Sequence, residues 1–226
     1  VTGGTGADTV TITSGMTGAV TADTLVVSTG AGNDNISITD AAATMTGAAG
    51  SIKINGGAGV DAITINLTNA LTSTAGIIAI TTKYGESTFS AYDTITGYQA
   101  GATGMKLVFT EPSGTTLAVA ADIAAGSGVT GYTTGQLTYG LSNGILSFSG
   151  TAASSLTISA VQSIVTNTIN GAQANGATFG WADNSGNTWV FNHASTDTVV
   201  ELVGLAAGSW SNGISTTAAA GKIFIG

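Results

Sequence analysis

The chain contains no cysteine and one proline, and its 226 residues include only four lysine or arginine side chains and one histidine. Without cysteine, a disulfide framework and thiolate metal sites are excluded. With so few basic residues, a surface that binds nucleic acid or anionic lipid is not expected. No apolar run reaches the roughly 18 residues that a membrane span needs, so we expect no membrane span.

Charge is scarce as well. Only 7% of the residues are charged, against roughly 25% in ordinary soluble proteins, whereas 34 residues are glycine. The 12 acidic residues give a net charge of −8, and clustered carboxylates with few basic partners suit a hard cation that prefers oxygen ligands. The chain starts at Val1 without an initiator methionine or a signal peptide, which indicates a fragment of a longer protein. We therefore expect a soluble, β-rich, extracellular type of module.

A glycine-rich segment recurs three times in the first third of the chain. Each copy contains an aspartate, and these aspartates are Asp8, Asp34 and Asp61, spaced by 26 and then 27 residues. Short runs of alternating apolar and polar residues flank each copy, which is typical of strands. The three copies are GGTGADTVT (Gly3 to Thr11), TGAGNDNIS (Thr29 to Ser37) and GGAGVDAIT (Gly56 to Thr64).

A regular period with two strands in each repeat predicts a coiled β structure whose successive rungs stack. Equivalent strands in adjacent rungs lie about 4.8 Å apart, and two carboxylates at that distance repel by about 3.5 kcal/mol at an effective dielectric constant of about 20. A divalent cation between rungs converts this repulsion into coordination, and carboxylates with backbone carbonyls are the oxygen set that Ca²⁺ favours. The predicted calcium ligands are Gly4, Thr5, Gly6, Asp8, Gly30, Ala31, Gly32, Asp34, Gly57, Ala58, Gly59 and Asp61.

These segments resemble the nonapeptide G-G-x-G-x-D-x-U-x of RTX (repeats-in-toxin) proteins. The first and third copies match every fixed position, and the middle copy has Thr29 in place of the first glycine. Family members usually repeat every 9 residues on both edges of the roll. The longer period here predicts calcium turns on one edge and longer loops on the other, with two sites between three turns. The alternative interpretation is three flexible turns that bind no metal.

The predicted fold is mainly all-β: a parallel β-roll or β-solenoid with stacked calcium turns, followed by an antiparallel β domain with one short helix. We expect the first domain to span residues 1–110, with Ala91 to Phe109 as a capping segment. Within it, Asp93 either binds a terminal calcium, together with Glu86, or serves in packing or a turn. The second domain is expected at residues 111–226.

Local signals in the second half predict two hairpins, a helix and closing strands. Asn143-Gly144 lies between two strand-like runs, which is a strong hairpin signal, and a second hairpin is expected around Asn184 to Asn187. Its aromatic residues Trp181, Trp189 and Phe191 are candidates for a core. TVVELVGL and the terminal KIFIG are typical of strands. Apolar residues at helical spacing predict a short amphipathic helix, and these are Val161, Ile164, Val165 and Ile169.

The order of these elements resembles the C-terminal regions of RTX-type bacterial surface-layer (S-layer) proteins and other proteins exported by type I secretion. Gly186 to Leu205 carries this likeness best. The resemblance implies a structural protein at the bacterial cell surface, which folds on calcium after export and assembles with itself into a lattice. It also implies an uncleaved secretion signal at Gly204 to Gly226, and attachment to cell-surface polysaccharide through parts outside this chain.

Enzyme chemistry is not expected. His193, Ser195 and Asp197 are neighbours in one predicted loop, which does not favour the convergence that a hydrolytic triad needs. Asp183 and Asp197 are candidates either for turn capping or for a further calcium site. Two alternatives to a surface-layer protein remain: a secreted adhesin with a carbohydrate cleft around Trp181 and Trp189, or the secretion domain of an exported hydrolase.

Overall fold

The computed structural model describes residues 1–14, 24–40, 51–68, 78–101, 105–110, 117–126, 129, 131–206, 214–217 and 222–225. The protein is mainly β, with parallel and antiparallel strand pairs and one short α-helix. The larger sheet has the order β1 (Thr9–Ser14), β3 (Asn35–Asp40), β5 (Ala62–Leu67), β7 (Asp93–Thr96), β15 (Thr198–Val203), β14 (Thr188–Asn192), β13 (Ala177–Ala182), β12 (Ile145–Ser149), β11 (Thr138–Ser142) and β10 (Ile123–Gly126), with β9 (Ala118–Val119) paired to β13. The smaller sheet has the order β16 (Ile214–Thr217), β17 (Lys222–Ile225), β8 (Lys106–Thr110), β6 (Ile78–Lys83), β4 (Ser51–Asn55) and β2 (Thr24–Ser28).

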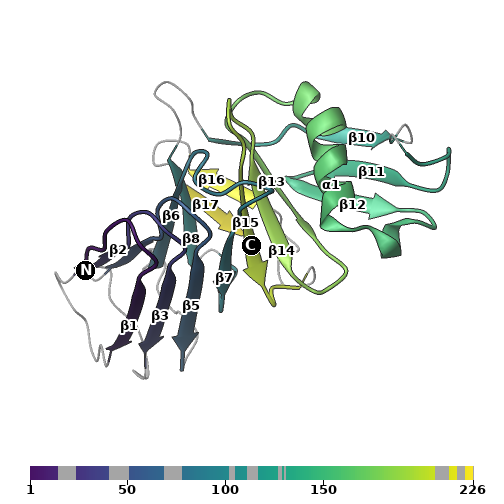
Figure 1. The fold of residues 1–226 in the computed structure, drawn as a ribbon. Helices are drawn as coiled ribbons and strands as arrows, with labels where there is room; N and C mark the ends of the chain where they lie inside the picture. Colours follow the sequence, from purple (N-terminus) through teal and green to yellow (C-terminus); the bar gives the residue numbers. More distant parts are fainter. Residues whose placement is uncertain are drawn as a thin grey trace.

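In the first half of the chain, successive strands alternate between the two sheets (Figure 1). β1, β3, β5 and β7 pair in parallel in one sheet, and β2, β4, β6 and β8 pair in parallel in the other. Apolar and polar residues alternate along each strand, so the apolar side of the strand faces the interior. Equivalent isoleucines are therefore in register, as in Ile36 opposite Ile63 and Ile52 opposite Ile78. Between the sheets lies a buried core that includes Val27, Ile36, Ile38, Ile52, Ile54, Ile63, Ile65, Ile78, Ile80 and Ile95.

Both sheets continue across the predicted domain boundary at residue 110. β7 pairs in parallel with β15, and β8 pairs antiparallel with β17. The smaller sheet is therefore mixed, and Val200, Leu202 and Ile225 belong to the core of the first half. In the second half, the hairpin strands are antiparallel, but β12 and β9 each pair in parallel with β13. The sequence did not predict these parallel pairs.

The predicted hairpins and the helix are confirmed. Asn143 and Gly144 have φ angles of 50° and 72°, as a two-residue hairpin turn between β11 and β12 requires. Helix α1 (Ile158–Ile164) starts after Thr157, whose side chain accepts a hydrogen bond from the Ala160 amide. The helical segment continues as a π-helix over Val165–Ile169, a change of period that the apolar pattern did not indicate. All four predicted apolar residues of this segment are buried, namely Val161, Ile164, Val165 and Ile169.

A second hydrophobic cluster lies between α1 and the hairpin strands, and its aromatic residues pack on one another. The Trp181 and Trp189 rings are stacked, with centroids 6.0 Å apart and an interplanar angle of 6°. The ring centroids of Phe179 and Phe191 lie 4.9 Å apart, and both side chains are fully buried. The expected aromatic core is therefore present, and it places Trp189 in the interior of the protein.

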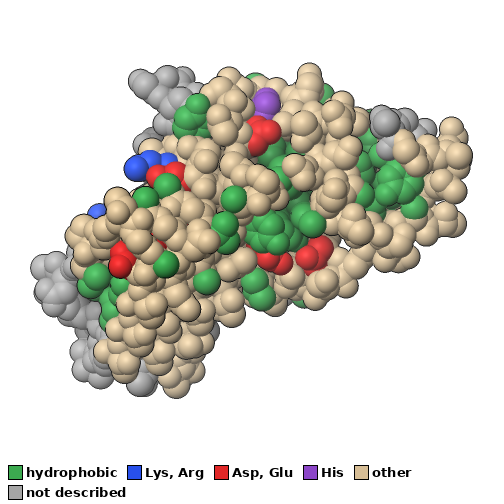
Figure 2. Space-filling view, in the orientation of Figure 1, with side chains coloured by type: hydrophobic (Ala, Val, Ile, Leu, Met, Phe, Trp, Pro, Cys, Tyr) green, Lys and Arg blue, Asp and Glu red, His purple; other side chains and the backbone are tan. Residues whose placement is uncertain are grey.

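Backbone and side chains that are neither hydrophobic nor charged make up most of the visible face, the tan surface of Figure 2. This agrees with the low content of charged residues. In the part of the chain that the structure describes, no helix combines the length and the apolar character needed to cross a membrane.

Candidate metal centre

The structure arranges four aspartates in one column along the larger sheet. The Asp8 amide donates to Asp34 Oδ1 over 2.8 Å, and the Asp34 amide donates to Asp61 Oδ1 over 2.9 Å. The Asp61 amide in turn donates to Asp93 Oδ1 over 3.0 Å. The last three carboxylates thus each accept the amide of the aspartate in the preceding rung. We call Asp8, Asp34, Asp61 and Asp93 the aspartate column.

Asp93 is the fourth member of the column, whereas the sequence suggested it only as a ligand of a terminal calcium or as a packing or turn residue. It follows Asp61 after 32 residues rather than 26 or 27, and no glycine turn precedes it. The signal that could have found it is local: Asp93 is followed by the alternating run Thr94-Ile95-Thr96, as Asp61 is followed by a strand. Strand register places Asp93 in the column, because Ile95 lies opposite Ile63.

The column ends at Ser87 and so is tied to the second half of the chain. The Asp93 amide donates to Ser87 Oγ over 2.8 Å, and this hydroxyl donates to the Val199 carbonyl oxygen in β15. Ser87 therefore takes the place of a fifth carboxylate. Glu86, the predicted companion of Asp93, instead forms an ion pair with Lys83, with 3.4 Å between Oε1 and Nζ.

Two carboxylate oxygens in the column are buried without a hydrogen-bond partner, Asp34 Oδ2 and Asp61 Oδ2. Their residues are 2% and 0% exposed. By contrast, half-buried Asp8 at the end of the column accepts the Gly4 amide at Oδ2 over 3.0 Å. Both ion pairs found among the described residues lie outside the column. Because buried charge is costly unless it is paired, these two oxygens would gain most from a positively charged partner.

The surroundings of Asp61 and Asp93 oppose ionisation of their carboxylates. Burial raises the pKa of Asp61, and the nearby charges of Asp34 and Glu86 raise it further. Burial also raises the pKa of Asp93 to about 8, with added contributions from the charges of Asp61 and Glu86. In each case the backbone amide bound to the carboxylate lowers the pKa, but it does not outweigh burial. Without a counter-charge, Asp61 and Asp93 therefore favour protonation.

The predicted turn ligands lie in turns that contact one another directly. The Ala31 amide donates to the Gly4 carbonyl oxygen, and the Ala58 amide donates to that of Gly30, each over 2.9 Å. The Gly32 amide donates to the Ala58 carbonyl oxygen over 2.8 Å. Three of the expected carbonyl ligands therefore already accept an amide, although a carbonyl oxygen has a second lone pair. Of the remaining turn residues, Thr5 and Gly6 are exposed.

The glycines of these turns serve two different purposes. Gly57 and Gly59 have φ angles of 94° and 138°, which only glycine adopts readily. At Gly3 and Gly56, by contrast, a Cβ atom would collide with the carboxylate of the aspartate in the same turn. In the first and third copies, the absence of a side chain at this position therefore leaves space for the carboxylate. Where Thr29 replaces it, the hydroxyl donates to the Gly56 carbonyl oxygen over 2.8 Å.

Substitution of Gly57 by alanine should destabilise the protein by about 3 kcal/mol, since it combines a positive φ with backbone overlap. The new Cβ would overlap the Gly30 carbonyl oxygen of the neighbouring turn. The matched control is Gly6→Ala, where a Cβ meets nothing within 4 Å, and this change should alter the free energy of unfolding by less than about 0.5 kcal/mol. Urea denaturation of both variants measures the difference. Equal effects would show that the turns do not stack in this way.

No group of three or more acidic or histidine side chains that could hold a metal is found among the described residues. The physical reason is the geometry of the column, which supplies one carboxylate per rung. A cation between two rungs would therefore meet two carboxylates and would need backbone carbonyls to complete its oxygen ligands.

The other polar groups singled out from the sequence have local roles. His193 Nδ1 lies 2.9 Å from Asp197 Oδ1, whereas Ser195 Oγ lies 2.8 Å from the Tyr84 hydroxyl. In these contacts the serine and the histidine have different partners, so the loop does not form a hydrolytic triad. Asp197 also accepts the Ala194 amide, as expected for turn capping.

Asp183 likewise caps its hairpin loop. Its carboxylate accepts the amides of Ser185 and Asn187, and its Oδ2 accepts Trp189 Nε1–H over 3.0 Å. Burial on its own would raise the pKa of Asp183, but the hydrogen bonds from Trp189, Asn187 and Ser185 together hold it below its usual range. Burial and the nearby Asp183 charge raise the pKa of Glu201.

Comparisons of the chain with protein-family models, with curated proteins and with solved structures find no match. Among the described residues, the aspartate column with its unpaired oxygens is the feature that points most directly to a ligand.

Proposed function

We propose that this chain is a calcium-ordered structural region of a bacterial surface-layer protein, with its first half forming an RTX-type β-roll. The observation that carries the proposal is the pair of buried, unpartnered oxygens, Asp34 Oδ2 and Asp61 Oδ2. They lie in consecutive rungs, as the hydrogen bond from the Asp34 amide to Asp61 Oδ1 indicates. The alternation of parallel strands between two sheets supports the β-roll.

The residues present fit Ca²⁺ chemically. Asp34 and Asp61 offer carboxylate oxygens, and the turn carbonyls of Gly30 and Ala58 keep a lone pair beside their amide bond. Ca²⁺ takes six to eight oxygen ligands in flexible geometry, so carbonyls of the same turns and water would complete the set. When bound, the cation supplies the positive charge that the column lacks.

The column also provides a reason for folding after export. With no cation bound, its carboxylates repel one another, and a chain with 34 glycines loses much conformational entropy on folding. Extracellular calcium modules have dissociation constants of about 10⁻⁴ to 10⁻³ M. Calcium inside a cell is far too dilute to fill such sites, whereas calcium outside fills them, and binding then contributes to folding.

Self-assembly is the second element of the proposal. The low content of charged residues suits close lateral packing, and bound calcium would offset part of the net charge of −8 that otherwise keeps copies apart. The proposal also includes a secretion signal at residues 204–226 and a location at the bacterial cell surface. Attachment to cell-surface polysaccharide would occur through parts outside this chain.

Electron microscopy of the purified protein tests the assembly. With millimolar calcium we expect ordered sheets, and with a chelator we expect dispersed protein. Dispersed monomers in both conditions, with calcium bound, would favour the adhesin and contradict the lattice. Magnesium at the same concentration is the control for ionic strength.

A further inference from the structure

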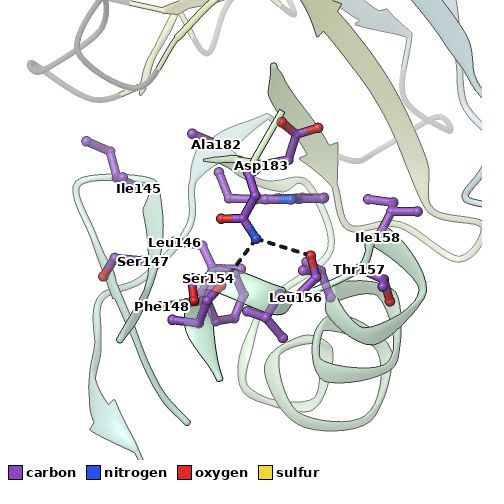
Figure 3. A pocket seen from close by; sticks show the side chains of 14 residues that line it. Ile145, Leu146, Ser147, Phe148, Ser154, Leu156, Thr157, Ile158, Ala182 and Asp183 are labelled. Carbon is purple, nitrogen blue, oxygen red and sulfur yellow. Dashed lines mark hydrogen bonds between the residues drawn. The ribbon is translucent and has the colours of Figure 1, made fainter. Parts of the chain in front are cut away.

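A cavity of about 350 Å³ lies apart from the aspartate column, in the second half of the chain. Its walls come from strand β12, from the turn at Ala153–Ser155 with the start of α1, and from the end of β13. Figure 3 shows the side chains of Ile145 to Phe148 on one side and those of Leu156 to Ile158 on the other. The volume falls at the lower end of the range for small-molecule pockets.

The topology accounts for the opening. β12 and β13 are parallel neighbours joined by a helical crossover, yet they pair at one position only, Ile145 opposite Gly180. The lining residues of both strands follow directly after that pair, at Ile145 to Phe148 and at Trp181 to Asn184. Space outside the carboxyl end of a parallel strand with a helical connection is a common position for ligands.

Asn184 supplies this cavity with a polar group that is accessible and has a defined orientation. The residue is exposed and lines the cavity. Its Nδ2 donates to the Ala153 and Leu156 carbonyl oxygens over 3.3 and 3.4 Å, the dashed lines between the two walls in Figure 3. Because both partners are acceptors, the nitrogen is the amide atom that must face them. The Oδ1 atom is therefore turned away from these carbonyls, and no described residue donates a hydrogen bond to it.

The rest of the lining narrows the class of ligand. Most of the walls are apolar, and no lysine or arginine lines the cavity, so an anion would find no positive partner there. Other acceptors of the lining are already engaged: Thr157 Oγ1 accepts an amide of α1, and the Asp183 carboxylate accepts the amides of Ser185 and Asn187. The free Oδ1 of Asn184 is thus the acceptor that is left for an O–H or N–H group of a ligand.

We propose that this cavity binds a small, neutral, mainly apolar molecule that donates one hydrogen bond, from an O–H or N–H group, to Asn184 Oδ1. The apolar walls hold the body of the molecule, and the amide oxygen selects for the donor. The site is independent of calcium and of lattice formation, so it stands or fails separately from the proposed function.

Titration of the full chain with phenol, and with toluene as the probe that lacks the donor, tests the role of Asn184. The two probes differ in hydrophobicity, so the informative quantity is the ratio of their affinities. This ratio should favour phenol roughly tenfold more in the unmodified protein than in Asn184→Ala, the effect of one hydrogen bond. The matched control is Asn167→Ala, which changes an exposed asparagine outside the cavity and should leave the ratio within about twofold. ¹H–¹⁵N spectra follow the binding and show that each variant is folded.

A second pair of variants locates the binding. Ser154 lines the cavity, whereas its neighbour Ser155 does not, and both are exposed. Ser154→Phe should weaken phenol binding at least roughly tenfold, and Ser155→Phe should leave it within about twofold. The absence of saturable phenol binding, an unchanged affinity ratio in Asn184→Ala or equal effects of the two phenylalanine variants would overturn the proposal.

Discussion

Addition of 10 mM calcium to the chelated protein should raise its melting temperature by roughly 10 to 20 °C. If two sites bind with a dissociation constant of about 10⁻⁴ M, each contributes about 2.7 kcal/mol, or about 5 kcal/mol together. For a chain of this size, 1 kcal/mol shifts the melting temperature by about 2 to 4 °C. The gain arises because Asp34 and Asp61 hold buried oxygens that no hydrogen bond satisfies. Calorimetry with and without calcium measures it.

The control variant is the double substitution Asp34→Asn and Asp61→Asn. An asparagine Oδ1 can still accept the amide of the preceding rung, so the hydrogen bonds of the column are retained while two charges are removed. This variant should lose most of the response to calcium. Asp122→Asn, which removes a charge at an exposed turn that binds the Asn143 amide, should keep the full response. A double variant that responds like the unmodified protein would place calcium elsewhere.

In calcium-free buffer, the protein should lose stability as the pH rises from about 4 to about 8. The pKa of Asp93 is raised to about 8 in the folded protein from 3.8 in the unfolded chain. The folded state therefore holds this proton more tightly, and the resulting stability is complete below pH 3.8 and is lost as the pH approaches 8. A shift of this size corresponds to at most about 6 kcal/mol. Chemical denaturation across this pH range measures the change.

Asp93→Asn is the control for this effect. The amide side chain can still accept the Asp61 amide through its Oδ1, but it does not titrate, so the variant should show a much flatter pH dependence and should be the more stable protein near pH 8. Saturating calcium should also flatten the dependence in the unmodified protein, because a nearby cation favours the ionised carboxylates. Stability that rises steadily from pH 4 to pH 8 without calcium would contradict the assigned environment of Asp93.

Much of the site could be predicted because its signals are local and repeated. The spacing of Asp8, Asp34 and Asp61 is visible in the chain, and strands with a constant period place such residues in one column. The hairpin at Asn143-Gly144 and the helical segment over Val161 to Ile169 could be predicted for the same reason, because neighbouring residues determine such local structures. Whether the column holds calcium remains a prediction.

Other parts depended on contacts between distant segments. Asp93 joins the column through strand register rather than through a glycine turn, and Ser87 ends it by reaching Val199 in β15. The pairing of β7 with β15 and of β8 with β17 also joins residues about one hundred positions apart. Sequence periodicity carries no information about such pairs, because each strand alone is compatible with many neighbours.

The sequence by itself determined a β-rich, weakly charged protein with a ladder of glycine turns and one aspartate in each. It did so because period and turn chemistry are encoded within a few residues. Only the tertiary structure decided that the column has a fourth aspartate, that two carboxylate oxygens are left without partners, and that a cavity opens beside Trp181. Burial and the absence of a partner are properties of packing, since they depend on what every other segment leaves unfilled.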